Sequence, residues 1–130
     1  MKQSIRTAII LALVFLSSAC NVLESENKGA AELRAVEQRW EDALKLAHST
    51  SRIALSNQVA TLQSIRRDVK SIPVGKCLEP AGRKLSEHMD AMIDGFLLFM
   101  GNDEYTAKTK FEKAETLFEE YKFIRNYCTG

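Results

Sequence analysis

The sequence predicts an all-α protein, specifically a four-helix up-down bundle stapled by one disulfide. Three observations lead to this prediction. Apolar residues recur at three- and four-residue steps from Ala30 to the C-terminus, strand-like alternation is absent, and the two prolines stand between the periodic segments. Two cysteines, Cys77 and Cys128, remain for a disulfide once the cysteine near the N-terminus is set aside.

Two periodic segments precede the first proline. Their apolar stripes are Leu33, Val36, Trp40, Leu44 and Ala47, and then Leu55, Val59, Leu62, Ile65 and Val69. The stripe keeps one helical phase across the junction Ser49-Thr50-Ser51, so the sequence also permits the alternative of one long helix packed on a helical hairpin. Matched helix lengths favour a break, because an up-down bundle then buries every helix along its length. Thr50 or Ser51 is expected to cap the second helix.

The second half of the chain predicts a helical hairpin. Ile72-Pro73-Val74-Gly75 ends the second helix, and Pro80 suits the first position of the third. The run from Gly95 to Gly101, GFLLFMG, contains five consecutive apolar residues that wrap more than one face of the third helix. One or two of them are therefore expected to protrude as a contact patch. Asp103 is expected to cap the fourth helix.

The third and fourth helices have similar predicted lengths. An antiparallel pairing brings the end of the fourth helix back to the start of the third, which places Cys128 beside Cys77. In an oxidising compartment the two cysteines are expected to form a structural disulfide. A redox-active pair is the alternative, but the sequence has no C-x-x-C arrangement.

The first 19 residues have the layout of a secretory signal peptide. Lys2 and Arg6 precede an apolar run from Thr7 to Leu16, and the small residues 17–19 lead into Cys20. The apolar run is too short to cross a bilayer, which needs about 20 residues. The N-terminus therefore predicts export of the chain.

A cysteine directly after small residues resembles the lipobox of bacterial lipoproteins. Ala19 and Cys20 match that pattern, whereas Ser17 stands where the class prefers leucine and Leu16 lies one place early. The resemblance implies that Cys20 carries lipid and anchors the mature chain to the cell membrane on its extracytoplasmic side. Asn21 after the cysteine implies the periplasmic face of the outer membrane, if the cell has two membranes. Ordinary secretion, with Cys20 free or lost, is the alternative.

These assignments divide the chain into a signal peptide (residues 1–19), a lipidated tether (residues 20–29) and a helical bundle domain (residues 30–130). The tether is polar and ends in Gly29. Two of the 18 Lys and Arg residues leave with the signal peptide, so the remainder nearly balances the 17 Asp and Glu. A nearly neutral chain has no general attraction for nucleic acid, so no nucleic-acid partner is expected.

Residues with catalytic or metal-binding chemistry are sparse. His88, Met89 and Met92 suit a soft metal ion, because imidazole and thioether groups bind copper. The methionines fall on the apolar stripe, however, so they are expected to fill the core, with His88 at the boundary between core and solvent. No serine lies in a G-x-S-x-G setting, and no paired-carboxylate motif stands out. The sequence predicts that the protein is not an enzyme, and it assigns no catalytic, cofactor-binding or metal-ligating residue.

Basic residues gather around the second loop. They form a possible docking surface, composed of Arg66, Arg67, Lys70, Arg83 and Lys84. An acidic partner or lipid phosphates would suit such a surface. The alternative is that these cations only complement the dipoles of helix ends.

The stretch SRIALSNQVATLQSIRR, with KCLEPA and MDAMIDGFLLFM, is similar to segments of uncharacterised helical proteins of the bacterial cell envelope. This resemblance implies a fold without an activity. We expect a non-enzymatic envelope lipoprotein that binds another macromolecule, a protein or envelope partner, or that supports an assembly. The competing expectation is a bundle that binds a small ligand or a metal, with His88, Met89 and Met92 as the residues to test.

Overall fold

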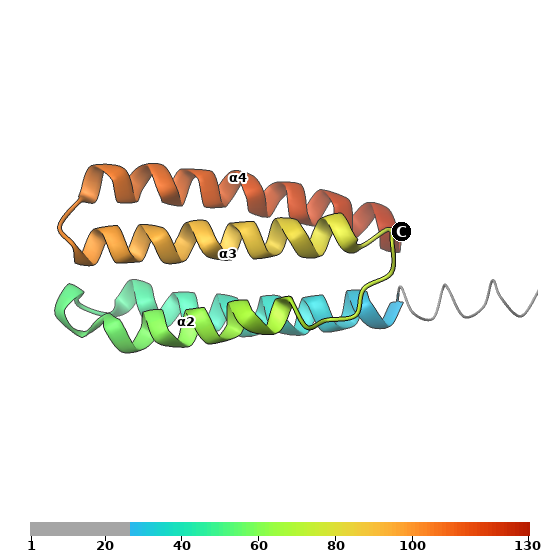
Figure 1. The fold of residues 1–130 in the computed structure, drawn as a ribbon, viewed down its shortest axis with the longest axis horizontal. Coiled ribbons are helices and arrows are strands. Elements are labelled where there is room, and N and C mark those ends of the chain that lie inside the picture. The colour runs from blue at the N-terminus through green and yellow to red at the C-terminus, as the bar shows by residue number, and fades with distance from the viewer. Residues whose placement is uncertain (1–26) are drawn as a thin grey trace, which may run out of the picture.

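The computed structural model describes residues 27–130, which form four antiparallel helices in one up-down bundle (Figure 1). The first helix covers residues 27–49, and the others are α2 (Ser56–Val69), α3 (Glu79–Met100) and α4 (Glu104–Thr129). A short 3-10 helix, η1 (Arg52–Ala54), lies between the first helix and α2. The predicted all-α bundle is confirmed, and the alternative of one continuous first helix is wrong.

The predicted signal peptide, Cys20 and the tether up to residue 26 lie outside the described residues. Residues 27–29, which the sequence analysis assigns to the tether, are helical. Gly29 is buried there against the loop before α3. A Cβ added at this position would lie only 3.1 Å from the backbone oxygen of Pro73 and 3.2 Å from Cα of Val74. The glycine thus permits close contact between the first helix and the loop before α3.

The hydroxyl residues at the first junction end one helix and do not start the next. Ser49 and Thr50 donate hydrogen bonds to the backbone oxygen of Leu46, over 3.0 and 2.7 Å. Ser51 precedes η1 and Leu55 precedes α2, and neither makes a side-chain capping bond. The expected capping role of Thr50 or Ser51 is therefore wrong. A hydroxyl that bonds to its own preceding turn is not available to the next helix.

The α3–α4 hairpin follows its local sequence signals. Pro80 is the second residue of α3, within its first turn and one place later than predicted. After Gly101 the chain turns at Asn102, whose φ of 67° is a left-handed conformation that asparagine tolerates better than most residues. Asp103 then accepts a hydrogen bond from the backbone N–H of Thr106 over 3.1 Å, which confirms it as the cap of α4.

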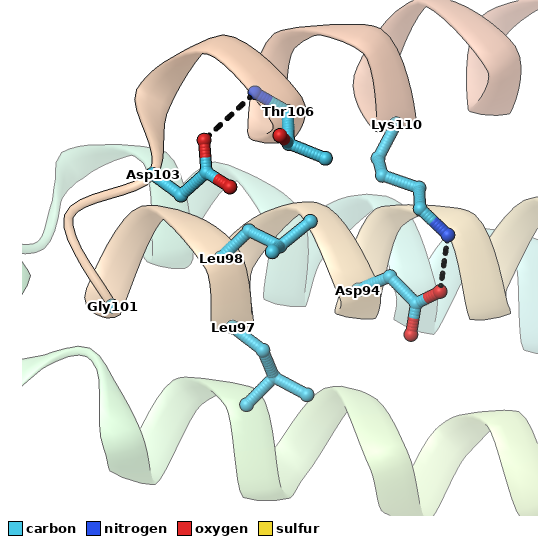
Figure 2. A pocket seen from close by; sticks show the side chains of 7 residues that line it. All are labelled: Asp94, Leu97, Leu98, Gly101, Asp103, Thr106 and Lys110. Carbon is cyan, nitrogen blue, oxygen red and sulfur yellow. Dashed lines mark hydrogen bonds and ion pairs between the residues drawn. The ribbon is translucent and has the colours of Figure 1, made fainter.

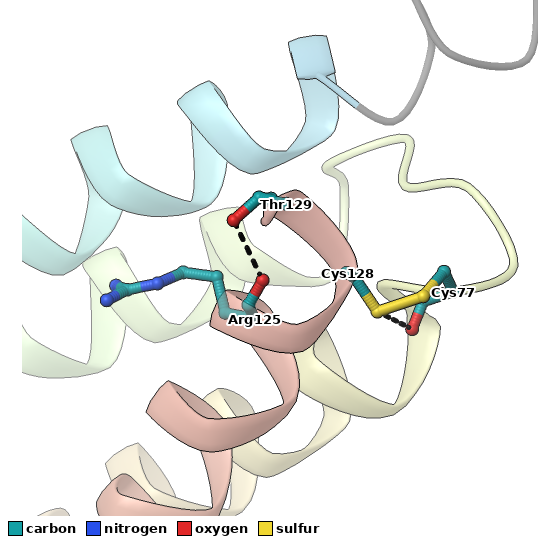
Figure 3. The surroundings of a disulfide bond; sticks show 4 residues. All are labelled: Cys77, Arg125, Cys128 and Thr129. Carbon is teal, nitrogen blue, oxygen red and sulfur yellow. Dashed lines mark hydrogen bonds between the residues drawn. A yellow bond between two sulfur atoms is a disulfide. The ribbon is translucent and has the colours of Figure 1, made fainter.

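Cys77 and Cys128 lie at disulfide distance, as predicted, with sulfur atoms 2.10 Å apart and Cα atoms 5.8 Å apart. Figure 3 shows that the bond fastens the loop before α3 to the last turn of α4. It closes a loop with a sequence separation of 51, which is worth roughly 4 kcal/mol by the chain-entropy argument. In the same turn, the Thr129 hydroxyl donates to the backbone oxygen of Arg125 over 3.0 Å (Figure 3).

The core lies along the bundle axis and draws on every helix. Trp40, Leu62, Leu85 and Tyr121 come from the four helices in turn, and each has an exposed fraction of 0%. Full burial of one side chain of this size stabilises the fold by about 1.5–3 kcal/mol. The four helices therefore depend on one another for stability.

Two glycines of α3 differ in what surrounds them. A Cβ on Gly95 would lie 2.4 Å from Cε1 of Phe111 on α4, closer than side-chain atoms approach one another. A Cβ on Gly82 would meet no atom within 4 Å. Gly95 is therefore required by the contact between α3 and α4, whereas Gly82 is not.

This difference predicts opposite effects for the same substitution. Gly82→Ala should raise the free energy of unfolding by roughly 0.5 kcal/mol, because alanine loses less backbone entropy than glycine in a helix. Gly95→Ala should lower it, since the Phe111 ring must move to make room. Thermal unfolding followed by circular dichroism would compare the two variants, and a stabilised Gly95→Ala protein would contradict the packing described for α3 and α4.

Candidate docking surfaces

His88 is the buried polar residue of the described part of the chain, with 6% of its surface exposed. Its Nε2 accepts a hydrogen bond from Trp40 Nε1 over 3.0 Å, and its Nδ1 donates to the backbone oxygen of Ala114 over 2.8 Å. Because an indole N–H only donates and a carbonyl only accepts, His88 is neutral with its proton on Nδ1. The expectation that His88 marks the boundary of the core is wrong. It lies where the first helix, α3 and α4 meet.

Neither ring nitrogen of His88 is free to bind a metal ion. Met89 and Met92 are buried in the hydrophobic core, as the apolar stripe predicts. Within residues 27–130 no three His, Cys, Asp or Glu side chains are arranged to hold a metal. The geometry therefore gives no support to a metal site at these three residues.

A second polar cluster joins the first helix to α4. Arg125 forms an ion pair with Glu37, and each side chain is only 13% exposed. The hydroxyl of Tyr121 donates to the same carboxylate over 2.9 Å, and the Arg125 guanidinium lies 5.0 Å from the centre of the Tyr121 ring. Burial raises the pKa of Tyr121 well above its ordinary value. The cluster pairs an acid of the first helix with a cation of α4, so both charges are used between helices.

Two of the five predicted docking residues are engaged in contacts between helices. Arg66 on α2 pairs with Asp90 on α3, and its Nε is buried without a hydrogen-bond partner among the described residues. Lys84 on α3 bonds to Glu120 on α4 over 2.7 Å, and this bond raises the pKa of Lys84. These two cations hold neighbouring helices together, so we leave them out of the docking surface.

The other three predicted residues, Arg67, Lys70 and Arg83, are exposed and form no ion pair within residues 27–130. Lys70 and Arg83 line one shallow groove of about 310 Å³ between the end of α2, the following loop and the start of α3. The loop also carries Lys76, which is exposed and equally without an ion pair among the described residues. We call the surface formed by Arg67, Lys70, Lys76 and Arg83 the basic end.

Large apolar side chains that are exposed in the described part gather towards the ends of the bundle. Four lie towards the end formed by the turns at 50–55 and 101–103, namely Leu46, Ile53, Leu97 and Tyr105. We call this group the tip. Ile53 is 96% exposed and Tyr105 is 86% exposed. Leu97 belongs to the GFLLFMG run, so the predicted protrusion of a residue from that run is confirmed.

Arg52 of η1 fixes the segments that carry the tip. Its guanidinium pairs with Glu104, donates to the side chain of Asn102, and lies 4.2 Å from the centre of the Phe99 ring. Ile53 follows one partner of the ion pair in sequence and Tyr105 follows the other. Both exposed side chains are therefore held on adjoining segments at one end of the bundle.

A shallow groove of about 480 Å³ lies beside the tip, between α3 and α4 (Figure 2). Leu97 and Leu98 provide its apolar part, and the ion pair between Lys110 and Asp94, 2.9 Å long, closes one side. Asp103 is used in capping α4, as Figure 2 shows. The groove thus offers an apolar surface with its charged groups already paired, which suits an apolar segment of another protein better than a charged ligand.

Comparisons of this chain with protein-family models, with curated proteins and with solved structures give no match. Among the helices of residues 27–130, none combines the length and the apolar character that crossing a bilayer requires. The function is therefore inferred from the surfaces described above.

The neutral state of His88 predicts a specific pH dependence of stability. Burial lowers its pKa, so below its ordinary value of about 6.5 the unfolded chain takes up a proton that the folded chain does not. The free energy of unfolding should then fall as the pH drops from 7 to 5, with a slope of at most about 1.4 kcal/mol per pH unit. Chemical denaturation at a series of pH values measures this slope.

The second histidine of the chain provides a matched control. His48→Gln removes a histidine but leaves the hydrogen bonds from Trp40 through His88 to Ala114 in place, so it controls for loss of a histidine. His88→Gln should lose most of the slope between pH 5 and 7. An equal slope in the His88→Gln protein would show that His88 does not titrate as its buried position requires.

Proposed function

We propose that this chain is a non-enzymatic lipoprotein, anchored to a membrane of the cell envelope at Cys20, whose helical bundle binds another protein through its tip. The observation that supports partner binding is the group of exposed apolar side chains at one end of the bundle. Ile53 and Tyr105 leave almost their whole side chains in water on two segments that Arg52 joins, and exposed apolar groups that lie close together are typical of binding sites. Their position is fixed by Arg52.

The position of the anchor is compatible with this role. The first helix begins at the end of the bundle opposite the tip, which is also the end that carries the C-terminus (Figure 1). The chain from Cys20 to residue 27 spans at most about 25 Å even when fully extended. A lipid on Cys20 would therefore keep the start of the first helix within about this distance of the membrane.

A contact through the tip needs little rearrangement of the bundle. The exposed side chains stand on η1 and on the ends of three helices, which are rigid elements, and the groove beside them is already open. Aromatic residues such as Tyr105 are frequent at the centres of protein interfaces because they bury a large area with little loss of conformational freedom. A partner with a complementary apolar face is the occupant that this surface suits.

The anchor is tested by labelling and fractionation. Radiolabelled palmitate should enter the wild-type protein, which should sediment with membranes. Cys20→Ala should remain unlabelled and appear in the soluble fraction. An unlabelled wild type, with a Cys20→Ala variant that still sediments with membranes, would contradict lipidation of Cys20.

The tip is tested by crosslinking in intact cells. A photocrosslinking residue at position 53 should give a discrete product with a partner protein, and the change of Tyr105 to Ser, made in the same chain, should remove that product. Phe123→Ser is the matched control, because Phe123 is 74% exposed on the same helix but lies away from the tip. A product that survives Tyr105→Ser, or that Phe123→Ser removes equally, would contradict binding through the tip.

A further inference from the structure

The basic end and the C-terminal turn of α4 form one continuous surface. The disulfide places Cα of Cys77 5.8 Å from Cα of Cys128 (Figure 3). Lys76 precedes the first cysteine and Tyr127 precedes the second, so the two lie at the same corner of the bundle. Tyr127 is 80% exposed. An aromatic ring with a polar hydroxyl is a side chain that favours the interface between membrane and water.

Positive charge exceeds negative charge on this surface. Most acidic side chains near it are already paired, in the pairs Glu120 with Lys84, Glu119 with Lys122, Asp68 with Arg39 and Glu32 with Lys28. Glu79 lines the same groove as Lys70 and Arg83 and forms no ion pair among the described residues. Against this one carboxylate stand the four cations of the basic end.

The groove of the basic end also offers apolar contact. Ile72 and Val74, both half-buried, line it together with Lys70, Arg83 and Glu79. A soluble acidic partner needs only the cations, whereas a phospholipid headgroup brings a phosphate together with the apolar beginning of its acyl chains. The combination of exposed cations, an apolar groove floor and an exposed tyrosine therefore fits an anionic membrane surface.

We propose that the basic end docks on anionic phospholipid headgroups of the membrane that carries the anchor, through Lys70, Lys76 and Arg83, and so holds the bundle upright with its tip away from the bilayer. This inference rests on the proposed anchor at Cys20. It extends that proposal, because a lipid at the end of a tether fixes the distance to the membrane but not the orientation of the bundle.

The test uses the full lipidated protein, reconstituted into vesicles of phosphatidylcholine alone or of phosphatidylcholine mixed with phosphatidylglycerol. Hydrogen exchange of backbone amides in the loop 70–78 and in the last turn of α4 is compared between the two. Exchange should be several-fold slower on the anionic vesicles. The difference should disappear at 1 M salt, where the Debye length falls to about 3 Å. Glycerol phosphate added to neutral vesicles should not reproduce the slowing, since it lacks the membrane surface.

The variant that tests the residues replaces Lys70, Lys76 and Arg83 with serine. These side chains are exposed and form no ion pair within the described residues, so the melting curve should match that of the wild type. The variant should exchange equally fast on both kinds of vesicle. A matched control replaces three exposed lysines outside the basic end, Lys45, Lys108 and Lys113, and should keep the slowing on anionic vesicles.

The outcomes separate the docking from the anchor. A wild-type protein that floats with both kinds of vesicle but exchanges equally on them overturns the docking and leaves the anchor in place. Slowing that persists at 1 M salt or in the triple variant also overturns it. A wild-type protein that floats with neither kind of vesicle overturns the anchor, and with it the proposed function.

Discussion

The arrangement of the first helix, α3 and α4 depends on the hydrogen bonds that run from Trp40 through His88 to the backbone of Ala114. The hydrophobic effect is not directional, so apolar stripes alone specify the rotation of each helix less sharply than a hydrogen bond does. The two hydrogen bonds at the centre of the core fix the relative positions of their partners, because a buried donor or acceptor that loses its partner costs about 1–3 kcal/mol. They tie the first helix, α3 and α4 together at one level of the bundle. The Phe118 ring packs against His88, with the two ring centres 4.8 Å apart.

The packing of the helices determines which surface charges pair with one another. Each pair of neighbouring helices carries an ion pair: Arg39 with Asp68, Arg66 with Asp90, Lys110 with Asp94, and Arg125 with Glu37. Exposed pairs of this kind contribute little stability. The pair of Glu37 and Arg125 is largely buried, so the cost of removing both charges from water offsets much of their attraction. These ion pairs matter for function because a cation that pairs with a neighbouring helix is less able to bind a partner. The cations at the end of the bundle that remain without an ion pair among the described residues define a smaller basic surface than the composition of that region indicates.

The sequence predicts the features that depend on neighbouring residues. Asp103 caps α4 by a bond to the first turn of that helix, and Pro80 lies in the first turn of α3. The pairing of Cys77 with Cys128 follows because α3 and α4 are antiparallel and similar in length. It does not predict features that depend on how one helix is rotated against another. His88 stands at the edge of its own stripe, and only the approach of Trp40 and Ala114 from two other helices makes it central. Within its own helix, each of Arg66 and Lys84 has the pattern of an exposed cation. The carboxylate that pairs with each of them lies on a neighbouring helix. Ser49 and Thr50 are residue types that can end one helix or begin the next. Both hydroxyls bond to the backbone oxygen of Leu46, so both residues belong to the end of the first helix.

Core side chains fill the interior of the bundle, and the exposed apolar groups of the tip and the cations of the basic end lie towards its two ends. Function is therefore expected at these ends. The ends are held in different ways. The disulfide fixes the loop of the basic end to α4, and the contacts of Arg52 fix η1 to the start of α4 at the tip. Between them α3 runs for 22 residues, or about 33 Å at 1.5 Å per residue. If the basic end lies on the membrane, as proposed, the tip stands about that far above the surface. That distance exceeds the Debye length of roughly 8 Å at physiological salt, so lipid charges would not act on a partner at the tip. Contact there would depend on apolar groups, which is the chemistry that Ile53 and Tyr105 present.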